Sequence, residues 1–398
     1  MRTRRGACYS PASCQDGRRK RRRIAGGGGG EGSAAAAAVA AGGVEGPAND
    51  MFEELPDDLV VSILADVAAS AGSPGDLAGA MLTCKRFREL GQSKVVVARA
   101  SPRCLAVRAK AWSDAAHRFL QRCADAGNLD ACYLLGMIRF YCLGSRGSGA
   151  ALMAAAAVGG HREALYSLAV IQFNGSGGSK DDRDLRAGAA LCARAASLGH
   201  VDALRELGHC LQDGYGVRRS VLDGRRLLIQ ANARELAAAV AASASLLRAA
   251  TGKPAAAASR RHSCLLSDFG CHAAAPKAGA EAHAANRFLV DWFVSRPLAA
   301  AAAAAAPTPG SAAEDEAGGL RLCSHALCGR PETRRHEFRR CSVCGVVNYC
   351  SRACQALHWK TAHKAECTPM DRWLDNAAAG AANPNAAAGD AAMAAPAP

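Results

Sequence analysis

Long apolar runs are missing from this chain of 398 residues. A membrane-spanning helix needs ~18 or more consecutive apolar residues, and the alanine run at 299–306 is much shorter and only weakly apolar. The charged N-terminus is followed by no hydrophobic segment, so we expect no secretory signal there. We therefore expect a soluble intracellular protein that makes no contact with a membrane.

Excess charge is missing from the body of the chain, although the formal net charge is +14. Residues 1–23 contain nine basic side chains and one acidic side chain, Asp16. Residues 320–367 contain nine basic and three acidic side chains. The remaining residues sum to zero, so the basic character is confined to an N-terminal tail and a C-terminal segment. Net charge therefore gives no support to general nucleic-acid binding.

Closely spaced cysteines are missing outside one C-terminal segment. Eleven of the eighteen cysteines are scattered along the chain without paired spacing, and the other seven lie between Cys323 and Cys367. Scattered thiols are typical of buried free cysteines in a reducing compartment and not of a disulfide framework.

The C-terminal segment arranges its cysteines and one histidine in four short pairs. The pairs are Cys323–Cys328, Cys341–Cys344, Cys350–Cys354 and His363–Cys367. Such spacing lets one tight turn or one helical turn aim both side chains at the same ion, and eight ligands satisfy two tetrahedral Zn²⁺ ions. Few apolar residues are available for a core, so binding zinc would fold the segment. With every position filled, no open site remains to activate water, and we predict a binding module without catalytic residues.

Other histidines in the segment leave alternatives open. His325 lies inside the first pair and is able to chelate a metal together with Cys328. His358 lies one helical turn after the third pair and competes with His363 for a place among the ligands. His336 is expected to be a solvated loop residue.

The end of this segment reads Tyr349-Cys-Ser-Arg-Ala-Cys-Gln355, followed by Trp359, His363 and Cys367. It resembles the MYND zinc finger, whose histidine occupies the seventh ligand position, and the resemblance favours His363 over His358. The first pair has four intervening residues, where a shorter spacing is commoner in the family. The resemblance implies interleaved sites: Cys323, Cys328, Cys350 and Cys354 on one zinc, and Cys341, Cys344, His363 and Cys367 on the other. Some MYND modules bind short proline-containing peptides, which makes Tyr349, Gln355 and Trp359 candidates for a peptide-facing surface, with packing inside the finger as the alternative.

Residues 50–92 carry apolar residues at helical spacing in the order Leu55-Pro56-x-x-Leu59, Ile63-Leu64 and Cys84-Lys-Arg-Phe87. Proline suits the first turn of a helix, and the glycine-containing stretch 71–75 should end that helix before two shorter ones. The pattern resembles the F-box, with Phe87 where Trp is commoner. The family implies docking to the SKP-type adaptor of a cullin–RING ubiquitin ligase. Carried over position by position, the docking face would be Leu55, Pro56, Leu59, Ile63, Leu64, Leu77, Cys84 and Phe87. The alternative is an ordinary amphipathic bundle that keeps these residues in its own core.

Residues 112–250 repeat a short pattern. Gly127, Gly160 and Gly199 lie 33 and 39 residues apart, each followed by Asn or His and, three positions further, by Ala. Paired helices with this period indicate an α-solenoid, and the pattern resembles the Sel-type repeat, a relative of the TPR. Such a solenoid offers a surface to another protein or serves as a rigid spacer. His161 and His200 are expected to be structural residues and not ligands.

The other segments are poor in apolar residues. Residues 1–49 and 376–398 have compositions typical of disorder, and Arg18–Arg23 is a basic hexamer of the kind that directs nuclear import. Residues 251–319 are predicted to be a linker that contains an apolar helix near 286–294. Phe288, Leu289, Trp292 and Phe293 share a face of that helix, which we expect to cap the end of the solenoid or to bind a partner.

An F-box, Sel-type repeats and a C-terminal MYND finger over residues 320–367 resemble, in this order, a plant family of F-box proteins. The fold class we predict is mainly α: a three-helix F-box, an α-solenoid, a small double-zinc finger and disordered termini. The resemblance implies a non-catalytic, substrate-recognition adaptor of an SKP–cullin–F-box ubiquitin ligase. Its partners would be the SKP-type adaptor and an unknown protein substrate. We expect it in the nucleus, with the cytoplasm as a second location.

Three other functions are weighed against this one. A nuclear transcriptional or chromatin cofactor would use the finger for recruitment without a ligase role. SET-domain lysine methyltransferases also carry MYND fingers, but the chain has no SET-like Asn-His-x-Cys element and no glycine-rich cofactor loop. Arg334, Arg335, Arg339 and Arg340 could touch phosphates, but nothing in this loop indicates contact with base edges.

Overall fold

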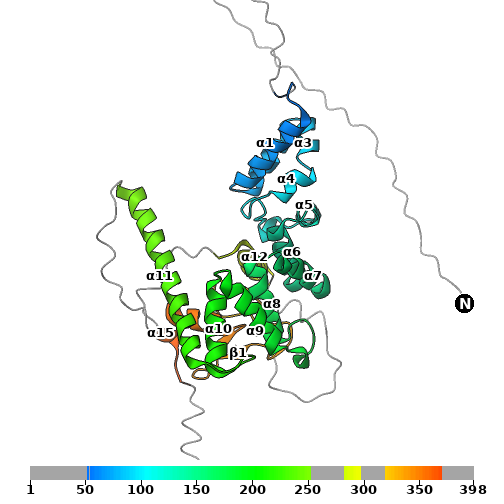
Figure 1. Cartoon of the computed structure of the whole chain (residues 1–398). Helices are drawn as coiled ribbons and strands as arrows, with labels where there is room; N and C mark the ends of the chain where they lie inside the picture. The colour runs from blue at the N-terminus through cyan, green and yellow to red at the C-terminus, as the bar shows by residue number, and fades with distance from the viewer. Residues whose placement is uncertain (1–51, 53, 252–281, 297–318, 370–398) are drawn as a thin grey trace, which may run out of the picture. The chain divides into compact units, whose positions relative to one another are not determined.

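The computed structural model of this chain describes residue 52 and residues 54–251, 282–296 and 319–369 (Figure 1). All of them belong to one unit, Met51–Pro398. The basic hexamer, the predicted disordered tails and most of the predicted linker lie outside the described residues. Among the residues described, no helix combines the length and apolar character that crossing a bilayer would require.

Four short helices begin the described chain: α1 Asp57–Ser70, α2 Pro74–Leu82, α3 Lys85–Leu90 and α4 Lys94–Ala98. The side chains of Ser73 and Asp76 form a capping box at the start of α2, which satisfies backbone N–H groups that the helix itself leaves unpaired. The Cys84 Sγ accepts a hydrogen bond from the Phe87 N–H at 3.3 Å and so caps α3. These side chains fix the turns between the first three helices.

Helix α4 was not predicted, and it completes the core of this bundle. It packs on α1 and buries Val96 and Val97. Three short helices supply too little apolar surface for a core, so the bundle continues past residue 92, and α4 also packs on α5, the first of the helices that follow.

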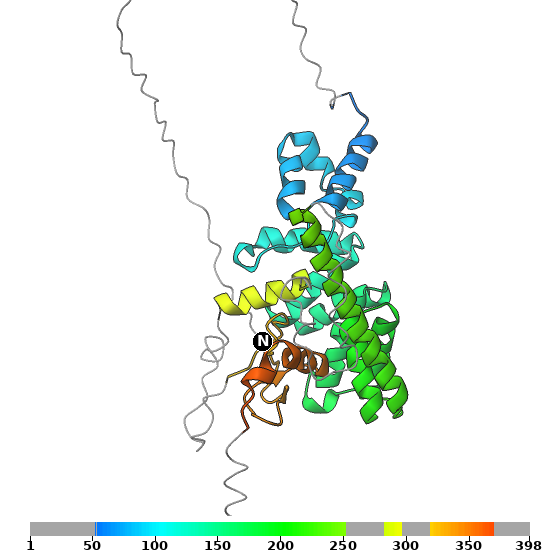
Figure 2. The same ribbon diagram turned by 90° about the vertical axis from the view of Figure 1, so that its left-hand side faces the viewer.

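Seven further helices follow, and each packs on the next (Figures 1 and 2). They are α5 Asp114–Asp125, α6 Leu129–Tyr141, α7 Arg146–Val158, α8 Arg162–Asn174, α9 Leu185–Ser197, α10 Val201–Asp213 and α11 Val221–Thr251. Short helical turns precede α5 (η1, Ala109–Ala111) and α9 (η2, Lys180–Asp182). The prediction of a mainly α-helical chain built on a solenoid of helix pairs is confirmed.

The repeated sequence pattern is a helix stop followed by a helix start. Gly127, Gly160 and Gly199 have φ angles of +89°, +86° and +87°, a left-handed conformation that glycine adopts without steric cost. The next residue, Asn128, His161 or His200, is the N-cap of α6, α8 or α10, and its side chain accepts a hydrogen bond from the N–H of the alanine three positions on. Residues of this type recur because every helix pair needs the same turn.

Helix α12 (Ala284–Ser295) packs on α6 and on η1 (Figure 2). Phe288, Leu289 and Phe293 are buried, and the Phe288 ring meets Trp112 edge to face at 5.4 Å between centroids. The helix therefore lies against the first helix pair, so the end of the solenoid that it covers is the N-terminal one. Its apolar face is already covered, which also opposes its use as a partner-binding motif.

The C-terminal finger is small and mostly irregular. Strands β1 (Arg339–Arg340) and β2 (Asn348–Tyr349) pair antiparallel, with Arg339 opposite Tyr349. A helical end follows, made of α14 (Arg352–His358), a π-helical turn η5 (Trp359–His363) and α15 (Lys364–Glu366). Helix α14 packs on α10, so the finger and the solenoid share contacts.

Candidate metal centre

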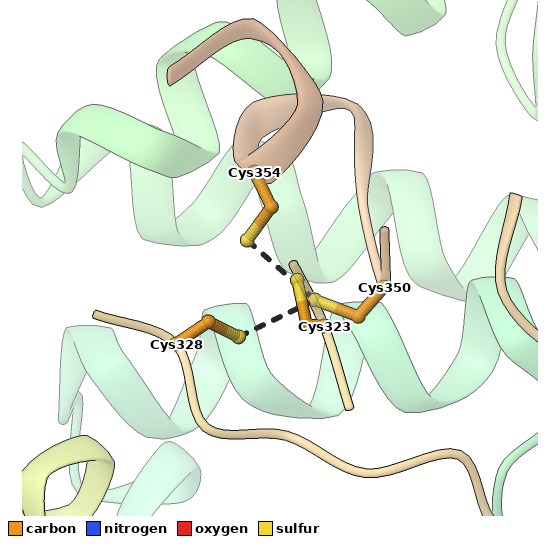
Figure 3. Close-up of side chains that lie close together, drawn as sticks. All are labelled: Cys323, Cys328, Cys350 and Cys354. Atoms are coloured by element: carbon orange, nitrogen blue, oxygen red, sulfur yellow. Dashed lines mark hydrogen bonds between the residues drawn. The ribbon is translucent and has the colours of Figure 1, made fainter. Parts of the chain in front are cut away.

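Four cysteines from distant parts of the finger converge on one point. The sulfur atoms of Cys323, Cys328, Cys350 and Cys354 lie within 4.8 Å of one another and face each other (Figure 3). Sγ–Sγ distances are 3.5 Å between Cys328 and Cys350 and 3.6 Å between Cys350 and Cys354. Tetrahedral Zn²⁺ with Zn–S bonds of ~2.3 Å separates its sulfurs by about 3.8 Å. All four residues are buried, so the group can hold one ion away from water.

The second group is Cys341, Cys344, His363 and Cys367. The Cys344 Sγ lies 3.5 Å from the His363 Nε2, and the Cys341 Sγ lies 3.9 Å from the Cys367 Sγ. The β1–β2 hairpin carries the two cysteines of the Cys341 pair, while the η5 turn and the end of α15 carry the other two side chains. Three thiols with one imidazole, like four thiols, form a donor set of structural zinc.

These two groups contain the same residues as the two sites implied by the MYND resemblance. Burial raises the pKa of the Cys323 thiol, whereas hydrogen bonds from Cys323 and the other thiols lower the pKa of Cys328. Opposite shifts are expected when neighbouring thiols share protons. The chain therefore has two sites suited to two zinc ions.

The competing histidines lie outside both groups. The His358 Nδ1 shares a hydrogen bond of 3.0 Å with the Tyr349 hydroxyl. The His358 ring also stacks on the His363 ring, with 5.5 Å between their centroids. His325 is not part of the first group, because Cys323 occupies that place beside Cys328. His336 is exposed and has a φ of +59°.

A buried arginine joins the first group to the solenoid. Arg330, with 3% of its surface exposed, donates to the Ser167 Oγ on α8 at 2.8 Å and approaches the Cys328 Sγ at 3.8 Å. Burial opposes its charge, but the negative charges of Cys328 and Cys350 outweigh burial and hold the pKa of Arg330 above its ordinary value. The guanidinium thus offsets the negative charge that four thiolates retain around one Zn²⁺.

Helix α8 holds the same part of the finger through two more hydrogen bonds. The Tyr166 hydroxyl donates to the Ser351 Oγ at 3.2 Å, and the Asn174 Nδ2 donates to the Cys350 carbonyl at 2.8 Å. Ser351 also caps α14 by accepting from the Cys354 N–H at 3.1 Å. The ligands Cys350 and Cys354 are therefore positioned by the repeats as well as by the finger.

Glu206 on α10 forms a second link. It is 2% exposed, and its Oε2 accepts a hydrogen bond from the Ala353 N–H at 2.9 Å, at the positive start of α14. Burial raises the pKa of Glu206, against the opposing charges of Arg339 and Arg352. Arg352 is itself ion-paired with Asp213 on α10.

Arg334 is a third link and not a phosphate contact. Its guanidinium donates to the Gly175 carbonyl at 2.5 Å and to the Asn174 carbonyl, both at the C-terminal end of α8. A cation there complements the helix dipole and satisfies carbonyls that the helix leaves unpaired. The side chain is engaged, so the idea that Arg334 contacts nucleic acid is not supported.

A third group, Asp130, His161 and His283, also brings ligand-type atoms within 4.8 Å of one another. The Nδ1 atoms of His161 and His283 accept hydrogen bonds from the Ala164 and Ala285 N–H groups, each at 3.2 Å. Each neutral ring must therefore carry its proton on Nε2, and His161 donates that proton to Asp130 at 3.1 Å. A protonated nitrogen cannot bind a metal, so this group is a structural network of the repeats.

The residues of the predicted docking face divide between surface and core. Leu59 and Ile63 are 48% and 41% exposed, Pro56 and Cys84 are exposed, and Leu55 and Phe87 are partly buried. Leu64 and Leu77 are 1% and 2% exposed, so their place on this face is corrected: they form the core against which α1 and α2 pack. Phe52, 45% exposed and edge to face with Phe87 at 5.6 Å, belongs to the surface and was missed by the sequence pattern.

The proposed peptide-facing residues also divide. Tyr349 is 1% exposed and belongs to the finger's interior, whereas Gln355 and Trp359 line a cavity beside α10 and α11. Arg330 and Glu206 were missed as well, because no local pattern marks a residue whose partner lies far along the chain.

Residues 105–186 match the family of plant tetratrico peptide repeats, and residues 323–367 match the MYND finger family. Fold and site thus define a helical-repeat protein with a two-zinc finger of the MYND type. F-box protein At1g67340 of Arabidopsis thaliana is 58% identical over 340 residues, covering 84% of this chain and 85% of the relative. F-box protein At5g50450 of the same plant is 56% identical over 330 residues, covering 83% and 89%. The chain belongs to this family of plant F-box proteins with TPR-like repeats and a MYND finger.

Among solved structures, a Sel1 repeat protein from Oxalobacter formigenes is 24% identical over 29% of this chain and 86% of that one, with a TM-score of 0.27.

Proposed function

We propose that this chain is the substrate-recognition adaptor of an SKP–cullin–F-box ubiquitin ligase. Its support is that both long relatives are named F-box proteins, and that their similarity extends over most of the chain. The observation that carries the proposal is the pair Leu59 and Ile63, one helical turn apart on α1 and both more than two-fifths exposed. Exposed apolar residues that lie together on one helix face offer a surface that a protein partner can cover.

In this proposal the chain performs no chemistry. The α1–α3 surface binds the SKP-type adaptor, the repeats and the finger hold the protein to be ubiquitinated, and other subunits catalyse transfer. The benefit is a raised effective concentration of the target at the ligase. The eight residues of the two metal groups are proposed as zinc ligands that stabilise the finger.

Binding to the adaptor tests the proposal. The full chain should co-purify with a plant SKP-type adaptor, and Leu59→Asp combined with Ile63→Asp should weaken binding at least about 100-fold, because carboxylates would be buried without partners. Leu222→Asp with Val240→Asp is the matched control, since both residues are exposed apolar positions on α11. Circular dichroism verifies that all forms are folded. A wild-type chain that does not bind the adaptor would refute the proposal and favour the nuclear cofactor.

Nuclear localisation is a separate proposal and rests on sequence alone. The basic hexamer Arg18–Arg23 should direct a fluorescent fusion of the chain to the nucleus. A fusion in which the hexamer is replaced by glutamines should be found mainly in the cytoplasm. Equal distribution of both fusions would contradict it.

A further inference from the structure

A cavity of about 760 Å³ lies where the finger meets the last helix pair of the solenoid. One wall comes from α10 and α11, and the opposite wall comes from β1, α14 and the η5 turn. The walls are separated by more than a hundred residues of sequence, so the cavity exists only when the finger is docked on the repeats. A volume of this size accommodates several amino-acid side chains.

The charge of the cavity has one sign. Its lining includes Arg225, Arg339 and Arg352, and no aspartate or glutamate is part of it. Arg352 is ion-paired with Asp213. Within the described part of the chain, the side chains of Arg225 and Arg339 form no hydrogen bond or ion pair, and the Arg339 guanidinium acts on the buried Glu206 only through space. Two guanidinium groups from opposite walls are therefore available to an anionic ligand.

Apolar side chains lie between these cations. Ile229 is 42% exposed on α11, with Leu228 buried beside it, and Trp359 contributes from the finger. In the part of the chain that the structure describes, the Trp359 Nε1 is buried and has no hydrogen-bond partner. Apolar contact area flanked by a few oriented cationic donors is typical of sites that bind an extended peptide.

We propose that this cavity binds an acidic peptide segment of the captured protein. Aspartate or glutamate side chains pair with Arg225 and Arg339, and an aliphatic or aromatic side chain between them packs on Ile229 and Trp359. The inference rests on the proposed function, which it deepens by naming the chemistry of the target. It differs from recognition of a proline-rich peptide by the finger alone, because half of the contacts come from the repeats and the charge decides binding.

The chain offers matched controls at adjacent positions. Arg226, next to Arg225, is ion-paired with Asp223 at 3.3 Å, and Arg340, next to Arg339, is exposed; neither lines the cavity. The cavity variant combines Arg225→Gln with Arg339→Gln, and the control variant combines Arg226→Gln with Arg340→Gln. Both variants lose the same charge from the same helix and strand. Fluorescence anisotropy measures binding of the full zinc-loaded chain to a labelled decapeptide of alternating Glu and Leu. A second decapeptide has Gln in place of every Glu.

The cavity variant should bind the Glu–Leu peptide at least about tenfold more weakly than wild type. The control variant should change the affinity for this peptide less than about twofold. The Gln–Leu peptide should bind at least about tenfold more weakly to wild type. Ile229→Ser should also weaken binding, because the apolar contact is lost. Equal effects of the two double variants, equal binding of both peptides, or tighter binding of a proline-rich peptide or an oligothymidylate would each overturn the inference.

Adaptor binding, measured on the same preparations, separates this inference from the proposed function. The cavity variant should bind the SKP-type adaptor like wild type, since its substitutions lie on α11 and β1 and not on the α1–α3 surface. Loss of peptide binding alone concerns the cavity, and a wild-type chain without adaptor binding refutes the ligase role whatever the peptide result.

Discussion

Replacing Arg330 by methionine should weaken one of the two zinc sites and leave the other intact. The guanidinium is the only cation that contacts the Cys328 sulfur in the described part of the chain, and it is buried between that sulfur and Ser167. Methionine fills a similar volume without charge. The variant therefore removes charge compensation while keeping most of the packing.

The size of the effect follows from two opposing contributions. Loss of a hydrogen bond that involves a charged group costs about 1.5–3 kcal/mol, while removal of a buried cation recovers part of its desolvation penalty. The direction of the Arg330 pKa shows that attraction to the thiolates exceeds the cost of burial. A net loss of about 2 kcal/mol corresponds to about thirtyfold weaker zinc binding at the four-cysteine group, within the range found for residues that contact metal ligands.

Competition with a chromophoric zinc chelator measures this effect. Wild type should release its two ions at high chelator concentration, and Arg330→Met should release the first ion at about thirtyfold lower concentration. Arg335→Met, which removes an exposed charge from the same finger, should behave like wild type. In metal-free protein fewer of the thiols carry a negative charge, so the variant should lose less stability there than in the zinc-loaded form. Unchanged zinc affinity with equal destabilisation of both forms would refute the reasoning and reduce Arg330 to a packing residue.

Three further predictions concern the finger and the repeats. Elemental analysis of the purified chain should find two zinc ions per molecule. Cys341→Ser should lower the zinc content to about one, because the group that has lost a ligand no longer holds its ion. A wild-type content of one or none would contradict the two sites. Burial opposes the charge of Glu163, but the hydrogen bond that it accepts from His200 and the nearby basic side chains hold its pKa at about 2, below the ordinary 4.5. The contribution of the Glu163 carboxylate to stability is therefore present above about pH 4.5 and lost as the pH falls toward 2. Glu163→Gln should lower the free energy of unfolding in urea by about 3 kcal/mol at pH 7 and by much less near pH 3. A loss of stability that does not depend on pH would exclude the ionic explanation. Gly149→Ala would place a Cβ 2.6 Å from the Phe140 N, which should lower the free energy of unfolding by about 1–3 kcal/mol. Gly147→Ala in the same helix meets no atom within 4 Å and should instead stabilise by about 0.5–1 kcal/mol; similar effects of the two would contradict the close helix crossing.

Local sequence patterns predicted those features whose cause is local. The three helix stops at Gly127, Gly160 and Gly199 are readable because each needs a left-handed residue followed by an N-cap. The short cysteine and histidine pairs are readable for a similar reason, since one turn must aim two side chains at one ion. The solenoid and the presence of two zinc sites therefore followed from spacing, whereas the division of the ligands between the two ions came from the resemblance to MYND fingers.

Features that depend on contacts between distant segments were not predictable in this way. Arg330 and Ser167 are 163 residues apart, and Ala353 and Glu206 are 147 apart, so nothing near either residue signals its role. Helical periodicity places Leu64 on an apolar face but does not indicate that α4 and the bundle core will cover it. The sequence did not indicate which end of the solenoid α12 would cover, because the pattern of an amphipathic helix does not specify the surface on which it packs.

Site-specific photo-crosslinking tests the central claim most directly, because it identifies the adaptor surface without adding a charge. Ile63 is replaced by p-benzoylphenylalanine, and in a separate preparation Leu222 on α11 is replaced in the same way; both positions are exposed. Each full-length protein is illuminated with the SKP-type adaptor, and products are identified by mass spectrometry. A one-to-one crosslink to the adaptor from position 63 and none from position 222 is the predicted result. Absence of a crosslink at position 63, or equal crosslinking from both positions, would contradict the assignment of the chain as a ligase adaptor that docks through α1.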